Sequence, residues 1–161
     1  MTIASLARIP VVDVRHGGPV RHAAEGRARA RALRDECIDW LPGLAAGLLP
    51  AMDGMTRLWL KRSHSPYAAE IHAIAAELDF SGIWFLNGCY QWGCTALARE
   101  QGDMPWLART LDWPFPGLGR HVEVARMRGN AGEFDSVTWP GYAGVLTASA
   151  RGRFAACINQ A

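Results

Sequence analysis

The sequence lacks any long apolar run, and its cysteines are few. No stretch of its 161 residues approaches the roughly 18 uninterrupted apolar positions that a transmembrane helix needs. Arg8, Pro10 and Asp13 interrupt the first residues, so we expect no signal peptide. Four scattered cysteines are too few for a disulfide framework. These absences predict a cytoplasmic protein with reduced thiols and no integral membrane segment.

Several functional motifs are also missing. The five histidines and four cysteines do not show zinc-ligand spacing such as C-x2-C with H-x3-H. The glycines match neither a dinucleotide-binding fingerprint nor a P-loop, and no serine lies in a nucleophile elbow. We therefore expect no metal and no cofactor.

Charge is balanced overall but uneven along the chain. The net charge is +2, half of the residues are hydrophobic and one fifth are charged, which is typical of one soluble globular domain. Five arginines crowd residues 21–34, and acidic residues interleave with them. The arginines are Arg21, Arg27, Arg29, Arg31 and Arg34, and the acidic residues are Glu25, Asp35, Glu36 and Asp39. The mixture favours a solvated helix face with i,i+4 ion pairs over a nucleic-acid patch.

The part before residue 93 has helical periodicity, apart from one strand-like run, "IPVVDV". The clearest helix is "SHSPYAAEIHAIAAEL", where Ser65 is a capping residue and Pro66 takes the first position. Ser81 is expected to cap a short apolar helix. Two further helical stretches are predicted near residues 33–48 and 52–61.

The part after residue 93 consists of short extended runs between turn signals. The runs are "CTALAR", "PWLARTLDW", "HVEVARM", "FDSVTW", "AGVLTA" and "RFAACIN". Their spacing predicts an antiparallel sheet, and the fold class is therefore α+β. The two parts, 1–93 and 94–161, are a helical leader and a β meander. Because the chain stops just after its last strand, we expect that further structure, self-association or a partner covers that edge.

The stretch "NGCYQWGCTALARE" places Cys94 where the helices give way to strands. Taken alone, Cys94 is a typical small core residue. The following strand, in "PWLARTLDWPF", carries Arg109 and Asp112 three positions apart. Positions i and i+3 of a regular strand face opposite sides. Both residues serve one site only if the strand kinks or ends at Asp112, for which Trp113-Pro114 gives a plausible reason.

An ordered set of motifs resembles the acid ceramidase and N-acylethanolamine acid amidase family. These enzymes are N-terminal-nucleophile (Ntn) hydrolases, more distantly related to bile-salt hydrolase, penicillin V acylase and penicillin acyltransferase. The matching features, in chain order, are Tyr-x-x-Glu-Ile-x-x-Ile-Ala at 67–75, Leu-Asn-x-x-Tyr at 86–90, Cys94-Thr95, and Arg-x-x-Asp with an aromatic at 109–113. The runs "WPGYAGVLTA" and "GRFAACINQ" resemble later strands of the same family.

The resemblance implies an αββα fold and a self-cleaving precursor, cut between Gly93 and Cys94. It implies an amidohydrolase acting on the C–N bond of an N-acyl, lipid-like amide. An α-amine and a thiol titrate near one another, so the freed amine of Cys94 can serve as the base without a histidine. No cofactor is implied.

By the same resemblance, Arg109 favours the thiolate, Asp112 orients the new amine, and Asn159 donates to the oxyanion. Trp113 and Phe115 are expected to form part of the acyl pocket.

Two alternatives stay open. An acyltransferase, in which an amine instead of water accepts the acyl group, uses the same residues. Members of the family continue well beyond the length of this chain, which supplies the leader and about one sheet. The chain is therefore also consistent with a truncated, catalytically inactive remnant or an interaction module.

Overall fold

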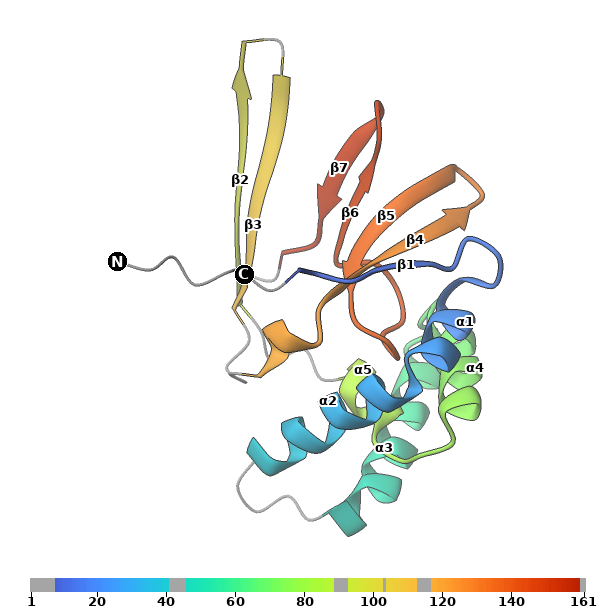
Figure 1. Cartoon of the computed structure of the whole chain (residues 1–161). Helices are drawn as coiled ribbons and strands as arrows, with labels where there is room; N and C mark the ends of the chain where they lie inside the picture. Colours follow the sequence, from blue (N-terminus) through green and yellow to red (C-terminus); the bar gives the residue numbers. More distant parts are fainter. Residues whose placement is uncertain (1–7, 41–45, 89–92, 103, 113–116, 160–161) are drawn as a thin grey trace.

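The computed structural model describes residues 8–40, 46–88, 93–102, 104–112 and 117–159 (Figure 1). Apart from one short strand, the part before residue 93 is helical, and strands dominate the part after it, which confirms the α+β class. The helices are α1 (Gly18–Glu25), α2 (Arg27–Trp40), η1 (Ala46–Leu48), α3 (Leu49–Arg62), α4 (Ala68–Leu78), α5 (Ile83–Gly88) and η2 (Leu118–Arg120). The strands are β1 (Val11–Asp13), β2 (Gly93–Gln101), β3 (Met104–Asp112), β4 (Glu123–Gly129), β5 (Gly132–Thr138), β6 (Thr147–Ala150) and β7 (Phe154–Cys157).

The strands form two sheets, where the sequence predicted one antiparallel sheet. A five-stranded sheet has the order β1-β4-β5-β6-β7, and β2 pairs only with β3. The larger sheet is mixed, because β1 runs parallel to β4 while its other neighbouring pairs are antiparallel. The strands after residue 93 pair with one another in antiparallel fashion, as predicted, but they form two sheets instead of one. Parallel pairing requires a long crossover, and the whole helical part supplies it.

The helices lie together below the five-stranded sheet in the view of Figure 1, and α1 contacts β4. Along β4 the side chains of Glu123, Ala125 and Met127 are buried, whereas Val124 is half-buried and Arg126 is exposed. This alternation is expected of a strand with one covered face. Between the helices lies an aliphatic core, formed by Ala23, Ala30, Leu60, Ile71, Ile74, Leu78, Ile83, Trp84 and Ala143.

A second hydrophobic group, which we call the central cluster, joins α2 to the strands. Its buried members are Leu33, Cys37, Leu118, Trp139 and Leu146. Leu86, Cys94, Leu111 and Tyr142 are partly buried and pack against it. The base of the β2–β3 hairpin therefore rests on this cluster, while the rest of the hairpin stands beside β7 (Figure 1).

Several predicted elements are close to the observed ones. The stretch 52–61 lies inside α3, and "IPVVDV" contains β1. The helix predicted to start at Ser65 begins at Ala68. The cap of α5 was wrong: the carboxylate of Asp53 accepts the backbone N–H groups of Gly82 and Phe85, at 2.7 and 2.9 Å, in the place expected for Ser81. This cap comes from another helix, so local sequence does not reveal it.

The fifth extended run was also misplaced. Residues 143–148 were predicted as a strand, but β6 covers Thr147–Ala150. Gly141 and Gly144 have φ values of +91° and +84°, which are left-handed and incompatible with a regular strand. The segment before β6 is thus a turn.

The arginine-rich segment matches its prediction in part. Arg21 and Glu25 form the expected i,i+4 ion pair at 2.6 Å. Arg34, however, is buried: it donates to the carbonyl oxygen of Ser81 at 2.5 Å, and its guanidinium lies over the ring of Phe80. The prediction of a wholly solvated face was wrong at Arg34, because this arginine packs against the start of α5.

The predicted boundary at residue 93 stays a prediction. The two parts share a sheet, since β1 from the first part pairs with β4 from the second. Within the described ranges, no helix combines the length and apolarity that crossing a bilayer demands.

Candidate functional site

Cys94 is the second residue of β2, at the base of the hairpin. It pairs with Leu111, and Ala96 pairs with Arg109 two positions further along. Directly opposite residues share a face, so Cys94 and Arg109 are diagonal neighbours on the same face of the hairpin. The side chain of Cys94 is half-buried against the central cluster. The thiol is thus neither sealed in a core nor fully exposed.

The guanidinium of Arg109 contacts the thiol. Its Nη2 donates to Sγ of Cys94 at 3.1 Å and to the carbonyl oxygen of Ile158 at 3.1 Å. Its Nε is buried and, among the described residues, has no hydrogen-bond partner. A fixed positive charge beside a sulfur atom stabilises negative charge on it. The pair therefore has the electrostatics of a nucleophile and its supporting cation.

Asp112 does not share that face. β3 continues in register through Asp112, which pairs with Gly93, and the alternation of the strand turns its exposed side chain to the other side. The kink that the sequence would need to bring Arg109 and Asp112 together does not occur within β3. Instead, Asp112 lies across from the residue that precedes Cys94. Asp112 therefore pairs with Gly93, on the face of the hairpin opposite the thiol of Cys94.

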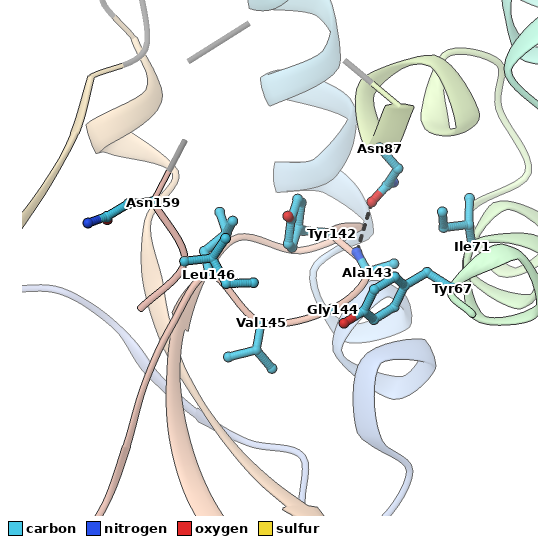
Figure 2. A pocket seen from close by; sticks show the side chains of 10 residues that line it. Tyr67, Ile71, Asn87, Tyr142, Ala143, Gly144, Val145, Leu146 and Asn159 are labelled. Atoms are coloured by element: carbon cyan, nitrogen blue, oxygen red, sulfur yellow. Dashed lines mark hydrogen bonds between the residues drawn. The ribbon is translucent and has the colours of Figure 1, made fainter. Parts of the chain in front are cut away.

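Asn159 follows β7 and lies next to the carbonyl group that Arg109 binds. Its side chain is exposed, and its Oδ1 accepts a long contact of 3.7 Å from Sγ of Cys157. Figure 2 shows its amide turned away from the neighbouring pocket residues. Arg109 thus links the chain segments that carry Cys94 and Asn159.

Trp113 and Phe115, expected in the acyl pocket, lie outside the described residues. A different group of side chains lines a cavity of about 450 Å³, which we call the loop cavity (Figure 2). Its apolar walls include Tyr67, Ile71, Tyr142, Val145, Leu146 and Ile158. Asn87 and Asn159 contribute the two amides. Its volume lies in the range of small-molecule sites.

The loop cavity adjoins the Cys94–Arg109 pair through shared neighbours. Ile158, whose carbonyl accepts from Arg109, lines it. Leu146 and Tyr142 line it as well, and both pack in or against the central cluster with Cys94. Sequence reasoning missed this cavity, because the turn that forms its wall was read as a strand. The two positive-φ glycines in "GYAG" were the available signal.

A second cavity, of about 640 Å³, lies between the hairpin and the sheet face that the helices leave uncovered. Arg109, Leu107 and Leu111 line it from β3, and Val124 and Val137 line it from the sheet. Leu146 lines both cavities. We call this one the sheet cavity. Arg109 therefore lines the sheet cavity and binds the carbonyl oxygen of Ile158, which lines the loop cavity.

Metal ligands and perturbed carboxyl groups do not add to this site. In the part of the chain that the structure describes, no three His, Cys, Asp or Glu side chains gather closely enough to hold a metal ion. The pKa of Glu36 lies below its ordinary value, first because Arg120 donates to its carboxylate and then because Nε2 of His121 lies 3.3 Å from it. Glu36 belongs to α2, which packs on the central cluster, so its ion pairs anchor η2 to this helix.

Comparison of the chain with known protein families, with curated proteins and with solved structures finds no match in any of the three.

Proposed function

We propose that the protein is an amidohydrolase of the Ntn class, which uses Cys94 as an autocatalytically exposed N-terminal nucleophile. The observation that carries this proposal is the 3.1 Å contact between Nη2 of Arg109 and Sγ of Cys94 at the start of β2. A cysteine that served only as core packing would have no need of a guanidinium. Arg109, diagonal to it, faces the same side.

In the self-cleavage step, the thiol of Cys94 attacks the carbonyl carbon of Gly93. The Gly93–Cys94 C–N bond breaks, the proton goes to the departing nitrogen, and a thioester joins Gly93 to the sulfur. Water then hydrolyses the thioester, which leaves a carboxylate on Gly93 and a free thiol and α-amine on Cys94. Glycine at position 93 leaves its carbonyl group open to attack. The pairing of Gly93 with Asp112 supports a role for this carboxylate in holding the new amine.

In turnover, the α-amine takes the thiol proton as the sulfur attacks the substrate's acyl carbon. The C–N bond of the substrate breaks, the amine leaves with that proton, and water hydrolyses the thioester with the α-amine as base. Arg109 stabilises the thiolate, and its buried Nε is an unused donor next to the site. Asn159 is the proposed oxyanion donor, and losing such a donor typically costs on the order of 10²–10³ in rate.

The two cavities support an apolar acyl group. The loop cavity is walled by aliphatic and aromatic side chains and reaches Asn159, beside the carbonyl oxygen that Arg109 binds. An N-acyl amide fits this layout, with its chain in the cavity and its carbonyl group at Asn159. An acyltransferase would use the same residues, with an amine in place of water.

The αββα architecture is part of the same proposal. One face of the five-stranded sheet, which carries Val124 and Val137, borders the sheet cavity. A second sheet stacked on that face, about 10 Å away, and a further helix layer outside it would complete a four-layer sandwich. The hairpin already stands over this face.

A second candidate function, a non-catalytic interaction module, is favoured by one observation. Phe154 and Ile158, in and just after the edge strand β7, have exposed fractions of 53% and 55%. Large apolar side chains at an open sheet edge are a surface on which another chain can pair. An uncut chain that self-associates would favour this candidate.

The test is the intact mass of the purified chain after incubation from acidic to mildly alkaline pH. We expect two pieces, one ending at Gly93 and one beginning at Cys94, and release of coumarin from a fluorogenic N-acyl aminocoumarin. Cys94→Ala abolishes both. Cys157→Ala, at the half-buried free thiol of β7, is the matched control and retains both. A wild-type chain that stays whole throughout, or a Cys94→Ala chain that still splits, would overturn the proposal.

A further inference from the structure

The turn Gly141–Gly144, between β5 and β6, is held by side chains from the helical part. It follows Pro140 and carries Tyr142, which packs against the central cluster and lines the loop cavity. Both terminal glycines have positive φ values, so the turn depends on conformations that other residues rarely adopt. Such a turn needs external contacts to fix its path.

Asn87 of α5 supplies two of these contacts, and it makes a third hydrogen bond within its own helix. Its Nδ2 donates to the carbonyl oxygens of Ile83 and Gly141, each at 2.9 Å. Its Oδ1 accepts from the backbone N–H of Ala143 at 2.8 Å (Figure 2). The side chain is only 6% exposed. A buried amide with three matched partners is a strong geometric constraint, because a displaced turn would leave buried polar groups unpaired.

Glu70 of α4 supplies the next contact along the turn. Its Oε1 accepts from the backbone N–H of Gly144 at 2.8 Å. The ring of Tyr67 lies against the same glycine: a Cβ added there would be 3.1 Å from Cε1 of Tyr67. Carboxylate acceptors make stronger bonds to N–H groups than neutral ones do. The turn is thus bonded at three of its four residues by only two side chains.

We propose that Glu70 and Asn87 are positioning residues for the reaction. This inference rests on the proposed function. They fix the turn, and the turn sets one wall of the loop cavity and the packing of Tyr142 beside the Cys94 cluster. Neither side chain needs to touch the reacting atoms. Both come from the part of the chain before Gly93, so that part belongs to the working site after the cut.

The turn should affect binding of the substrate and not the chemical step at the thiol. Loosening the turn widens the cavity wall but leaves the Arg109–Cys94 contact in place, because that contact is made by the hairpin and Ile158. Binding of a long acyl chain should weaken, while the step at the thiol proceeds at its normal rate. Loss of uniform binding raises KM and leaves kcat unchanged.

The main test variants change the hydrogen bond from the backbone N–H of Gly144 to Glu70. Glu70→Ala removes the acceptor for Gly144, whereas Glu70→Gln keeps an oxygen in the same place. Glu77→Ala, at an exposed position of the same helix, is the matched control. Asn87→Asp keeps the acceptor for Ala143 but removes both donated bonds. If Asn87→Asp fails to fold, comparison of Glu70→Ala with Glu70→Gln still tests the positioning role.

The measurements are kcat and KM for N-acyl aminocoumarins with short and long chains, together with hydrogen exchange at the amides of Ala143 and Gly144. Glu70→Ala should raise KM for the long chain roughly three- to tenfold. It should leave kcat and the short-chain KM unchanged, and should speed exchange at Gly144. Glu70→Gln should restore most of the KM, and Glu77→Ala should behave as wild type.

Three results would overturn the inference. Faster exchange at Gly144 with unchanged KM would show that the bond is structural only, and the proposed function would stand. A fall in kcat for both chains with unchanged KM would indicate a smaller folded fraction instead of a positioning role. Absence of any turnover by the wild-type protein would overturn the proposed function, and this inference with it.

Discussion

Gly93 and Asp112 face each other across the β2–β3 hairpin, in direct register. Opposite residues of an antiparallel pair have Cα atoms about 4.5–5.5 Å apart. The backbone of Asp112 is therefore next to Gly93, whereas the side chain of Arg109 is on the other face of the hairpin, with the thiol. The thiol and the amine of one cysteine would thus have separate partners on the two faces of one strand.

This relationship predicts the effect of Asp112→Asn. The amide cannot hold an ammonium group in place by charge, so kcat for amide hydrolysis should fall on the order of 10²-fold. Because the side chain is exposed, the free energy of unfolding should change by less than about 0.5 kcal/mol. Thr110→Ala, on the same exposed face, is the control for kinetics and urea unfolding. Equal losses in the two variants would contradict the assignment.

Arg109→Met should lower the reactivity of the thiol of Cys94. Without the guanidinium, negative charge on the sulfur loses its nearest cation, so alkylation by iodoacetamide near neutral pH should slow several-fold. Arg109→Lys should restore only part of the rate, since a lysine lacks the fork that joins the sulfur to the carbonyl oxygen of Ile158.

Mass spectrometry of the alkylated chain, with Cys157 as the internal reference, measures this rate. Arg99→Met, on the exposed strand β2 and the opposite face of the hairpin, is the control. If both methionine variants slow alkylation equally, the effect is one of overall charge and the specific contact is irrelevant.

A buried charged group, away from the site, joins α1 to β4. His22 and Glu123 are each 1% exposed and bonded to one another, and Nη2 of Arg29 lies 2.8 Å from the carboxylate. Removing one partner of a buried pair leaves the other uncompensated, so Glu123→Ala should cost about 3–5 kcal/mol of unfolding free energy. Arg29→Ala should cost about 1 kcal/mol or less, because that side chain is 44% exposed. Urea unfolding measures both, and equal costs would refute this ranking.

Acid should weaken the five-stranded sheet at the turn between β4 and β5. Arg128, and then Arg15, donate to Glu133 and hold its pKa below the ordinary value of 4.5. A lowered pKa means that the unfolded chain binds the proton more tightly, so this stabilisation is present above pH 4.5 and is lost as the pH falls below it.

Thermal unfolding at a series of pH values checks this. Glu133→Gln should flatten the decline of Tm below pH 4.5, and it should lower Tm slightly at neutral pH. The control is Glu77→Gln on α4, which should keep the wild-type slope. A Glu133→Gln curve parallel to wild type would rule out the linkage.

Local sequence patterns predicted the positions of helices and strands better than they predicted which segments contact one another. The periodicity of residues 67–78 predicted α4 to within a few residues of its start. The alternation rule placed Arg109 and Asp112 on opposite faces, and the structure agrees. Because the hairpin brings Gln101 opposite Met104, its register also brings Gly93 opposite Asp112. The turn signal at Gly102 was the part of the sequence that indicated this register.

Contacts between distant segments were beyond local reasoning. The cap of α5 by Asp53, the burial of Arg34 and the clamp of Glu70 and Asn87 on the 141–144 turn join residues 29 to 74 positions apart. Tertiary packing alone decides such contacts. The same holds for the separation of the hairpin from the larger sheet, because every strand pattern was compatible with a single sheet.

The parallel pairing of β1 with β4 gives the proposed cut a further consequence. The edge strand β1 of the five-stranded sheet precedes the proposed cleavage site, and the other four strands of that sheet follow it. Severing the backbone would turn an intramolecular sheet into an interface between two polypeptides. Their cohesion would then follow mass action, so dilution, which leaves an uncut chain unaffected, would favour dissociation of the matured form.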